Sequence, residues 1–142
     1  MPCAHHSCAQ GFFYQAMDKK AEQYFSRGSK KLHEADQELY KPEEDVVSLV
    51  ICRSTIGSIE NYLKGFLTLR GFEIEEEQTL GDLMERCRML DPKFHKIQIE
   101  QIDCRNLKDP DLHCEEIEKF GACYEVADQL DTLLRKKGII SG

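Results

Sequence analysis

The chain contains no long hydrophobic run, which excludes a membrane-spanning helix at the level of sequence. Crossing a bilayer as a helix needs roughly 20 consecutive apolar residues, and no stretch of the 142 residues approaches that length. The first residues also lack the basic region followed by an apolar region that marks a secretory signal. With 41% hydrophobic and 32% charged residues, we expect a globular cytoplasmic protein with no membrane partner.

An excess of positive charge is missing as well. The 19 Lys and Arg residues stand against 26 Asp and Glu residues, for a formal net charge of −7. Non-specific nucleic-acid binding depends on a basic surface. The excess of acidic residues therefore disfavours strong nucleic-acid binding by the monomer, but it does not exclude binding in a local cleft. Short basic stretches such as residues 135–137 are interpreted as solvated helix ends. Repeats, low-complexity tracts and pairs of strand-like segments are also lacking.

The cysteines are many but do not form a recognisable framework. There are seven, an odd number, and they are spread along the chain. Cys52, Cys87 and Cys123 fall on apolar helix faces, where cysteine behaves as a small hydrophobic residue, so we expect reduced core thiols rather than disulfides. Residues 3–8 hold two Cys and two His, too close together to wrap one tetrahedral ion. No metal site is predicted.

Apolar residues recurring at steps of three and four predict amphipathic helices. The clearest stripe lies in residues 46–67 and contains Leu49, Cys52, Ile56, Ile59, Leu63 and Phe66. Similar stripes predict helices over about 13–40 and 114–137 and a shorter helix that ends before Asp91. The fold class predicted is therefore an all-α, antiparallel, up-and-down bundle of four to five helices.

Local signals set the predicted boundaries. Pro42 suits a first helical position and Gly71 a C-cap, so the second helix is expected over about 43–70. Thr79 and Asp82 match a capping box for the third helix, and Gly28 predicts either close helix approach or a kink. Residues 93–103 fit a short helix or an extended piece. We expect a loose leader at 1–12, a single domain at 13–138 and a frayed tail at 139–142.

Charged residues border the stripe of the second helix. Glu60 and Lys64 stand four apart in the order that favours an ion pair worth about 0.3–0.5 kcal/mol. Together with Arg53 they either support the scaffold or line a groove or dimer seam, and both interpretations stay open. Asp109, in the polar loop over residues 105–111, is a further candidate binding residue.

Residues 60–67, ENYLKGFL, resemble the second-helix signature of HEPN domains. Residues 79–87 are similar to that family's Thr-His-Asp-Leu stretch, and residues 105–111 resemble its polar Arg-Tyr-Pro-Asp loop. The likeness covers about residues 16–137. It implies a small, commonly dimeric helical bundle without cofactor that binds nucleotide or RNA, often with a nucleotidyltransferase-type protein partner. Many members are metal-independent ribonucleases or toxins of toxin–antitoxin pairs.

The catalytic branch of that family uses an Arg, a polar residue and a His four to six residues beyond the Arg. The nearest match is Arg105, Asn106 and His113, but seven residues lie between Arg105 and His113, and Pro110 is among them. We therefore expect a non-catalytic domain that binds a nucleotide, RNA or a protein partner as a homodimer. Two alternatives remain. One is a ribonuclease in which His113 moves the 2′-hydroxyl proton and Arg105 stabilises the phosphate charge. The other is a pure dimerisation or assembly module.

Overall fold

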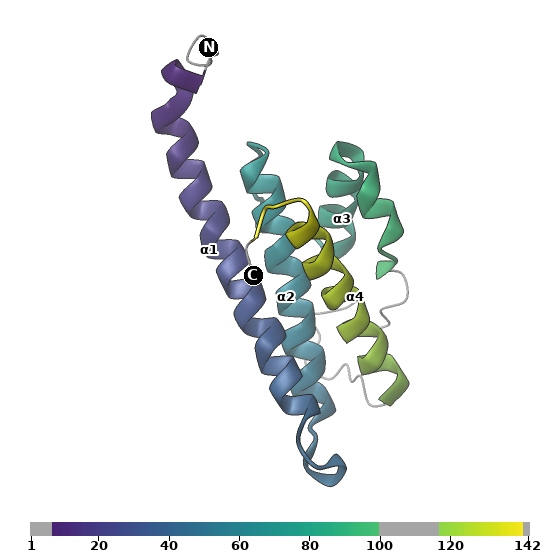
Figure 1. Ribbon diagram of the computed structural model, residues 1–142. Coiled ribbons are helices and arrows are strands. Elements are labelled where there is room, and N and C mark those ends of the chain that lie inside the picture. The colour runs from purple at the N-terminus through teal and green to yellow at the C-terminus, as the bar shows by residue number, and fades with distance from the viewer. Residues whose placement is uncertain (1–6, 100–116, 141–142) are drawn as a thin grey trace.

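The computed structural model describes the backbone of residues 7–99 and 117–140, and the side chains of residues 19–42, 44–47, 50–99 and 123–140. It confirms the predicted all-α bundle (Figure 1). No strand occurs within these two described stretches. The elements are α1 (Ser7–Leu39), the 3₁₀ turn η2 (Glu43–Asp45), α2 (Ser48–Leu69), α3 (Leu80–Leu90), the 3₁₀ turn η3 (Pro92–Lys96) and α4 (Ile117–Lys136).

Helices α1 and α2 form an antiparallel hairpin, and α4 packs beside α2 (Figure 1). Helix α1 runs antiparallel to both α2 and α4, and α2 and α4 therefore run parallel to each other. Helix α4 begins at the same end of the bundle as α2 (Figure 1). At 33 residues, α1 is longer than the 22-residue α2, and its N-terminal part extends past the end of α2 in Figure 1.

The α1–α2 contact is close because glycines lie where the helices meet. A Cβ atom on Gly28 would stand 2.7 Å from Cδ1 of Tyr62, and one on Gly65 would stand 2.6 Å from Cε1 of Phe25. Both distances are far below van der Waals contact, so neither position has room for a side chain. The close approach predicted at Gly28 is confirmed.

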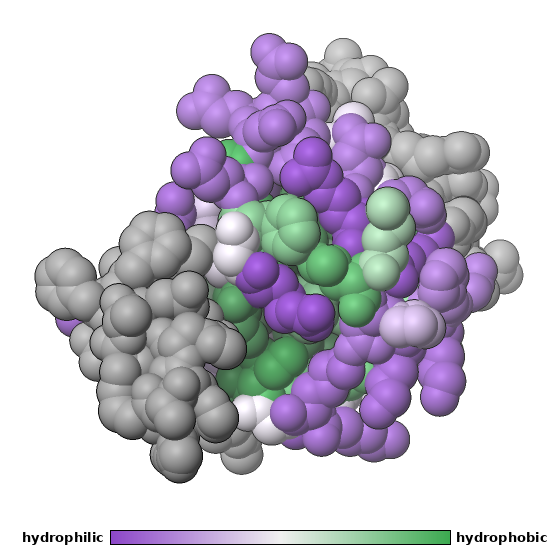
Figure 2. All heavy atoms as spheres, turned by 90° about the horizontal axis from the view of Figure 1, so that it is seen from above, coloured by the Kyte–Doolittle hydropathy of each residue, from purple (hydrophilic) through white to green (hydrophobic). Residues whose placement is uncertain are grey.

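The central helix α2 contributes more buried hydrophobic residues than any other described element. Five members of its predicted stripe are at most 4% exposed, namely Cys52, Ile56, Ile59, Leu63 and Phe66. The other helices contribute buried residues that include Ala21, Ala35, Leu83, Met84, Cys87, Ala127, Leu130 and Leu134. Seen from above, hydrophobic side chains gather in a hollow framed by hydrophilic ones (Figure 2).

Helix ends follow the predicted signals with one shift. Gly71 and Gly138 have positive φ values of 92° and 75°, and at each glycine the chain closes a Schellman-type end, with the next residue donating its N–H back to Leu67 or Leu134. Thr79 and Asp82 form the predicted capping box. Helix α2 begins at Ser48 rather than near residue 43. The reason is that the Glu38 carboxylate accepts the Val47 N–H at 2.9 Å, which separates the short η2 turn from α2.

Three further expectations need correction. The leader predicted over 1–12 is already helical from Ser7. In the tail, Ile139 and Ile140 are partly buried against the core, because the turn at Gly138 folds them back. Cys52 is disulfide-bonded rather than reduced, while Cys87 and Cys123 are buried thiols. Helical periodicity shows that a cysteine faces inward, but not whether a second thiol lies within bonding distance.

Candidate functional site

Four lysines surround a hollow between η3 and the C-terminal turns of α4. This lysine groove has a volume of about 390 Å³ and is lined by Lys93, Lys96, Ile97, Gln129, Thr132, Leu133, Lys136 and Lys137. The four α4 residues recur at steps of three, one and three, which places them on one helical face, and Lys137 follows directly after the helix. The groove therefore combines an apolar floor, two uncharged polar side chains and four positive charges.

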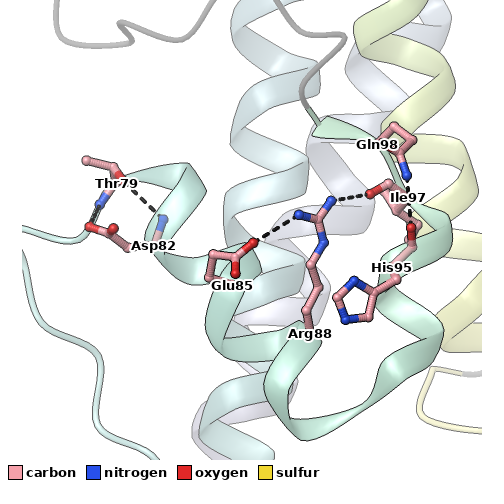
Figure 3. Close-up of polar contacts among 7 residues, drawn as sticks. All are labelled: Thr79, Asp82, Glu85, Arg88, His95, Ile97 and Gln98. Atoms are coloured by element: carbon pink, nitrogen blue, oxygen red, sulfur yellow. Dashed lines mark hydrogen bonds and ion pairs between the residues drawn. The ribbon is translucent and has the colours of Figure 1, made fainter.

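Packing and a buried arginine fix the η3 side of the lysine groove. Phe94 is fully buried, and its ring centroid lies 4.6 Å from that of Phe66 on α2. Arg88, only 8% exposed, donates from Nη2 to the Ile97 carbonyl at 2.7 Å and from Nη1 to Glu85 at 3.0 Å (Figure 3). The Arg88 side chain in the last turn of α3 thus fixes the C-terminal end of η3. The η3 turn itself carries Lys93 and Lys96.

Asp91 joins the three elements around the lysine groove. It stands between α3 and η3, where Oδ1 accepts the Lys93 backbone N–H at 2.9 Å and caps η3. Its Oδ2 pairs with the Lys137 ammonium at the end of α4. The hydrogen bond from Lys137 is the main reason that the Asp91 pKa lies below its usual range, and the Lys93 N–H adds to the effect.

The remaining lysine charges are not offset in the same way. Lys93, Lys96 and Lys136 are exposed, and none of the three forms an ion pair within the described part of the chain. One interpretation is that lysines near helix C-termini only complement the helix dipole. A binding interpretation accounts in addition for their convergence on one hollow, since ammonium groups bind phosphate as point charges and small-molecule pockets usually measure about 300–1,000 Å³.

A second polar cluster lies on the other side of α4 and serves as scaffold. The Tyr62 hydroxyl donates to Asp131 at 2.6 Å and lies 3.0 Å from the Ser29 hydroxyl, and Tyr124 donates to Asp36 at 2.9 Å. The pKa of Tyr124 is raised to about 12, mainly by burial of the phenol and secondly by its hydrogen bond to Asp36. Burial and Asp131 likewise raise the pKa of Tyr62. These bonds attach α4 to α1 and α2 and keep both phenols protonated.

The candidates from the sequence are distributed differently. Glu60 and Lys64 form the predicted ion pair at 3.0 Å, partly exposed on α2. Arg53 is exposed and has no ion pair among the described residues, and none of the three lines the lysine groove. The other candidates, Arg105, Asn106, Asp109 and His113, lie outside the described residues.

Sequence reasoning missed the lysine groove. The sequence pattern of residues 135–137 is typical of a solvated helix end, and Lys93 and Lys96 belong to a segment that fits either a short helix or an extended piece. The available signal was that two helical segments, about forty residues apart, both end in lysines. Only the folded chain shows that these ends lie side by side.

Membrane-spanning helices and metal sites are absent from the described residues. No helix there combines the length and apolarity needed to cross a membrane. In the same stretches, no three His, Cys, Asp or Glu side chains converge in a way that suits a metal ion. Comparisons of the chain with protein-family models, with curated proteins and with solved structures found no match.

Proposed function

We propose that this chain is a HEPN-like, non-catalytic, homodimeric domain that binds a nucleotide, or the phosphate-bearing end of an RNA, in the lysine groove. The observation that carries the proposal is the convergence of four lysines on one hollow in a protein of net charge −7. The resemblance of residues 60–67 and 79–87 to HEPN domains supports the same class of ligand. It also suggests a nucleotidyltransferase-type protein as a partner.

The lysine groove keeps a net positive charge, and so favours an anion, even when the negative helix ends and Asp91 are counted. The negative ends of α4 and η3 point toward it, and a helix end amounts to about half an elementary charge at most. With Asp91 they offset about half of the four lysine charges, so a net positive field remains. An ammonium about 4 Å from a phosphate charge contributes about 1 kcal/mol in a water-like dielectric, or roughly fivefold in Kd.

The floor and the polar rim suit the uncharged part of a nucleotide. Leu133 is half-buried and offers apolar surface to a base or ribose, beside the buried Ile97 that closes the floor. Gln129 and Thr132 are exposed and carry hydrogen-bonding groups. The groove thus provides separate contacts for the phosphates and for the remainder of the ligand.

Calorimetric titration with ADP at low ionic strength tests the proposal. Replacing Lys93, Lys96 and Lys136 together by Gln removes the three lysines without ion pairs, and at about 1 kcal/mol each we expect binding to weaken roughly a hundredfold. The matched control replaces three exposed lysines of α1, namely Lys19, Lys20 and Lys30, by Gln. It removes the same charge and is expected to change the affinity less than threefold through the long-range field.

The proposal is wrong if the wild-type chain binds neither ADP nor a 5′-phosphorylated oligoribonucleotide, or if the control loses as much affinity as the groove variant. Cleavage of RNA that disappears when Arg105 and His113 are replaced by Ala would instead support the ribonuclease alternative. A light-scattering mass equal to the single chain of 16.4 kDa would contradict the homodimer.

A further inference from the structure

Lys137 differs from the other lysines of the lysine groove because it already has an anionic partner within the protein. Its ammonium lines the hollow, yet it pairs with the Asp91 carboxylate. The two side chains are only 19% and 14% exposed, so the pair is more shielded than most surface ion pairs. An anion entering the groove therefore meets one lysine that is occupied and three that are not.

The position of Asp91 is fixed from two sides. One carboxylate oxygen accepts the Lys93 N–H at the start of η3, and the other contacts Lys137 at the end of α4. Both partners are residues of the lysine groove. Asp91 is thus a negative group held beside a positive site, where it is the counter-ion of Lys137.

We propose that Asp91 is an internal competitor of the ligand, so that a bound phosphate must draw Lys137 away from it. This inference rests on the proposed function. A terminal phosphate carries nearly two charges near neutral pH, whereas a carboxylate or a phosphodiester carries one. Competition with Asp91 therefore favours nucleotides with a terminal phosphate over those whose phosphate is a diester.

The variant Asp91→Asn removes the competing charge and keeps the cap, because the Asn side-chain oxygen also accepts the Lys93 N–H. We expect ADP to bind this variant roughly three- to tenfold more tightly than the wild type in the same calorimetric assay. The control is Asp128→Asn, an exposed aspartate of α4 that influences Tyr124 and is absent from the lysine groove. It removes an equal charge and is expected to leave the affinity within twofold.

A second variant separates competition from a general charge effect. If Asp91 occupies Lys137, then Lys137→Gln costs little affinity in the wild-type background but roughly fivefold in the Asp91→Asn background. Equal costs in both backgrounds would overturn the inference, as would unchanged or weaker ADP binding by Asp91→Asn. Cyclic AMP, a diester of the same nucleoside, should bind the wild type more weakly than ADP, and equal affinity would contradict the ligand preference.

These outcomes distinguish the inference from the function on which it rests. If the wild type binds ADP through the lysines and Asp91→Asn binds no better, only the competition is refuted. If neither the wild type nor Asp91→Asn binds ADP or a 5′-phosphorylated oligoribonucleotide, the proposed function fails as well. Far-ultraviolet circular dichroism of each variant establishes that the compared proteins are equally folded.

Discussion

Replacing Gly28 by Ala should destabilise the protein, although alanine is the better helix former. The intrinsic preference for Ala over Gly inside a helix is about 1 kcal/mol. Against it, the new Cβ atom would lie 2.7 Å from Cδ1 of Tyr62 and 3.2 Å from the Ser58 carbonyl oxygen. The Tyr62 ring is fully buried, and its hydroxyl is bonded to Asp131 at 2.6 Å, so the ring cannot move aside without breaking that bond.

Overpacking of this kind costs about 1–3 kcal/mol, and breaking a buried hydrogen bond costs about 1–3 kcal/mol more. After the helix preference is subtracted, we expect the free energy of unfolding to fall by about 1–5 kcal/mol. For a chain of this size that corresponds to a drop in Tm of roughly 4–20 °C.

Urea unfolding followed by circular dichroism measures this change. Gly81→Ala is the matched control, because Gly81 lies in the exposed first turn of α3 and the nearest atom to its Cβ position is Thr79 Oγ1 at 3.7 Å. There the helix preference acts without a clash, so stability should rise by up to about 1 kcal/mol. The reasoning is refuted if Gly28→Ala unfolds at the same or a higher urea concentration than the wild type.

Three further changes test the contacts around the candidate site. Arg88→Leu leaves the carbonyl at the end of η3 without its donor and should cost about 1–3 kcal/mol, with faster hydrogen exchange in residues 93–98; unchanged exchange would contradict the role given to Arg88. The Asp91 carboxyl has a lowered pKa when folded, so its stabilising effect is present above its unfolded pKa and is lost as pH falls through the folded value. Asp91→Asn should therefore flatten the acid-unfolding profile, and a profile as steep as that of the wild type would argue against the Lys137 contact. Tyr62→Phe removes the hydroxyl that donates to Asp131 Oδ1 and should lower the free energy of unfolding by about 1–2 kcal/mol in urea, whereas an unchanged midpoint would show that this bond contributes nothing.

Features that depend on nearby residues were predictable from the sequence. The stripe of α2, the capping box at Thr79 and the helix end at Gly71 each involve groups within a few residues of one another. The close approach at Gly28 was predictable as well, although its partner Tyr62 was not, because a missing side chain signals proximity without naming the neighbour.

Features that depend on tertiary contacts were not predictable. Lys93 and Lys136 are separated by about forty residues, and the Asp91–Lys137 pair is a tertiary contact that links their segments. From the sequence the tail over residues 139–142 is expected to fray, yet the turn at Gly138 folds Ile139 and Ile140 onto the core. Pattern analysis detects periodic faces and therefore misses sites that form between chain ends.

The Tyr62–Asp131 and Tyr124–Asp36 hydrogen bonds also determine the axial position of α4. An apolar stripe such as Leu130 and Leu134 would pack almost as well after a slide of one helical turn, about 5.4 Å, but these hydrogen bonds fit at only one register. Because Lys136 is the last residue of this helix and Lys137 follows it directly, that register decides how far their ammonium groups stand from Lys93 and Lys96. Substitutions at the tyrosines should therefore alter the spacing of the lysine charges from the opposite side of the helix, without contacting any ligand.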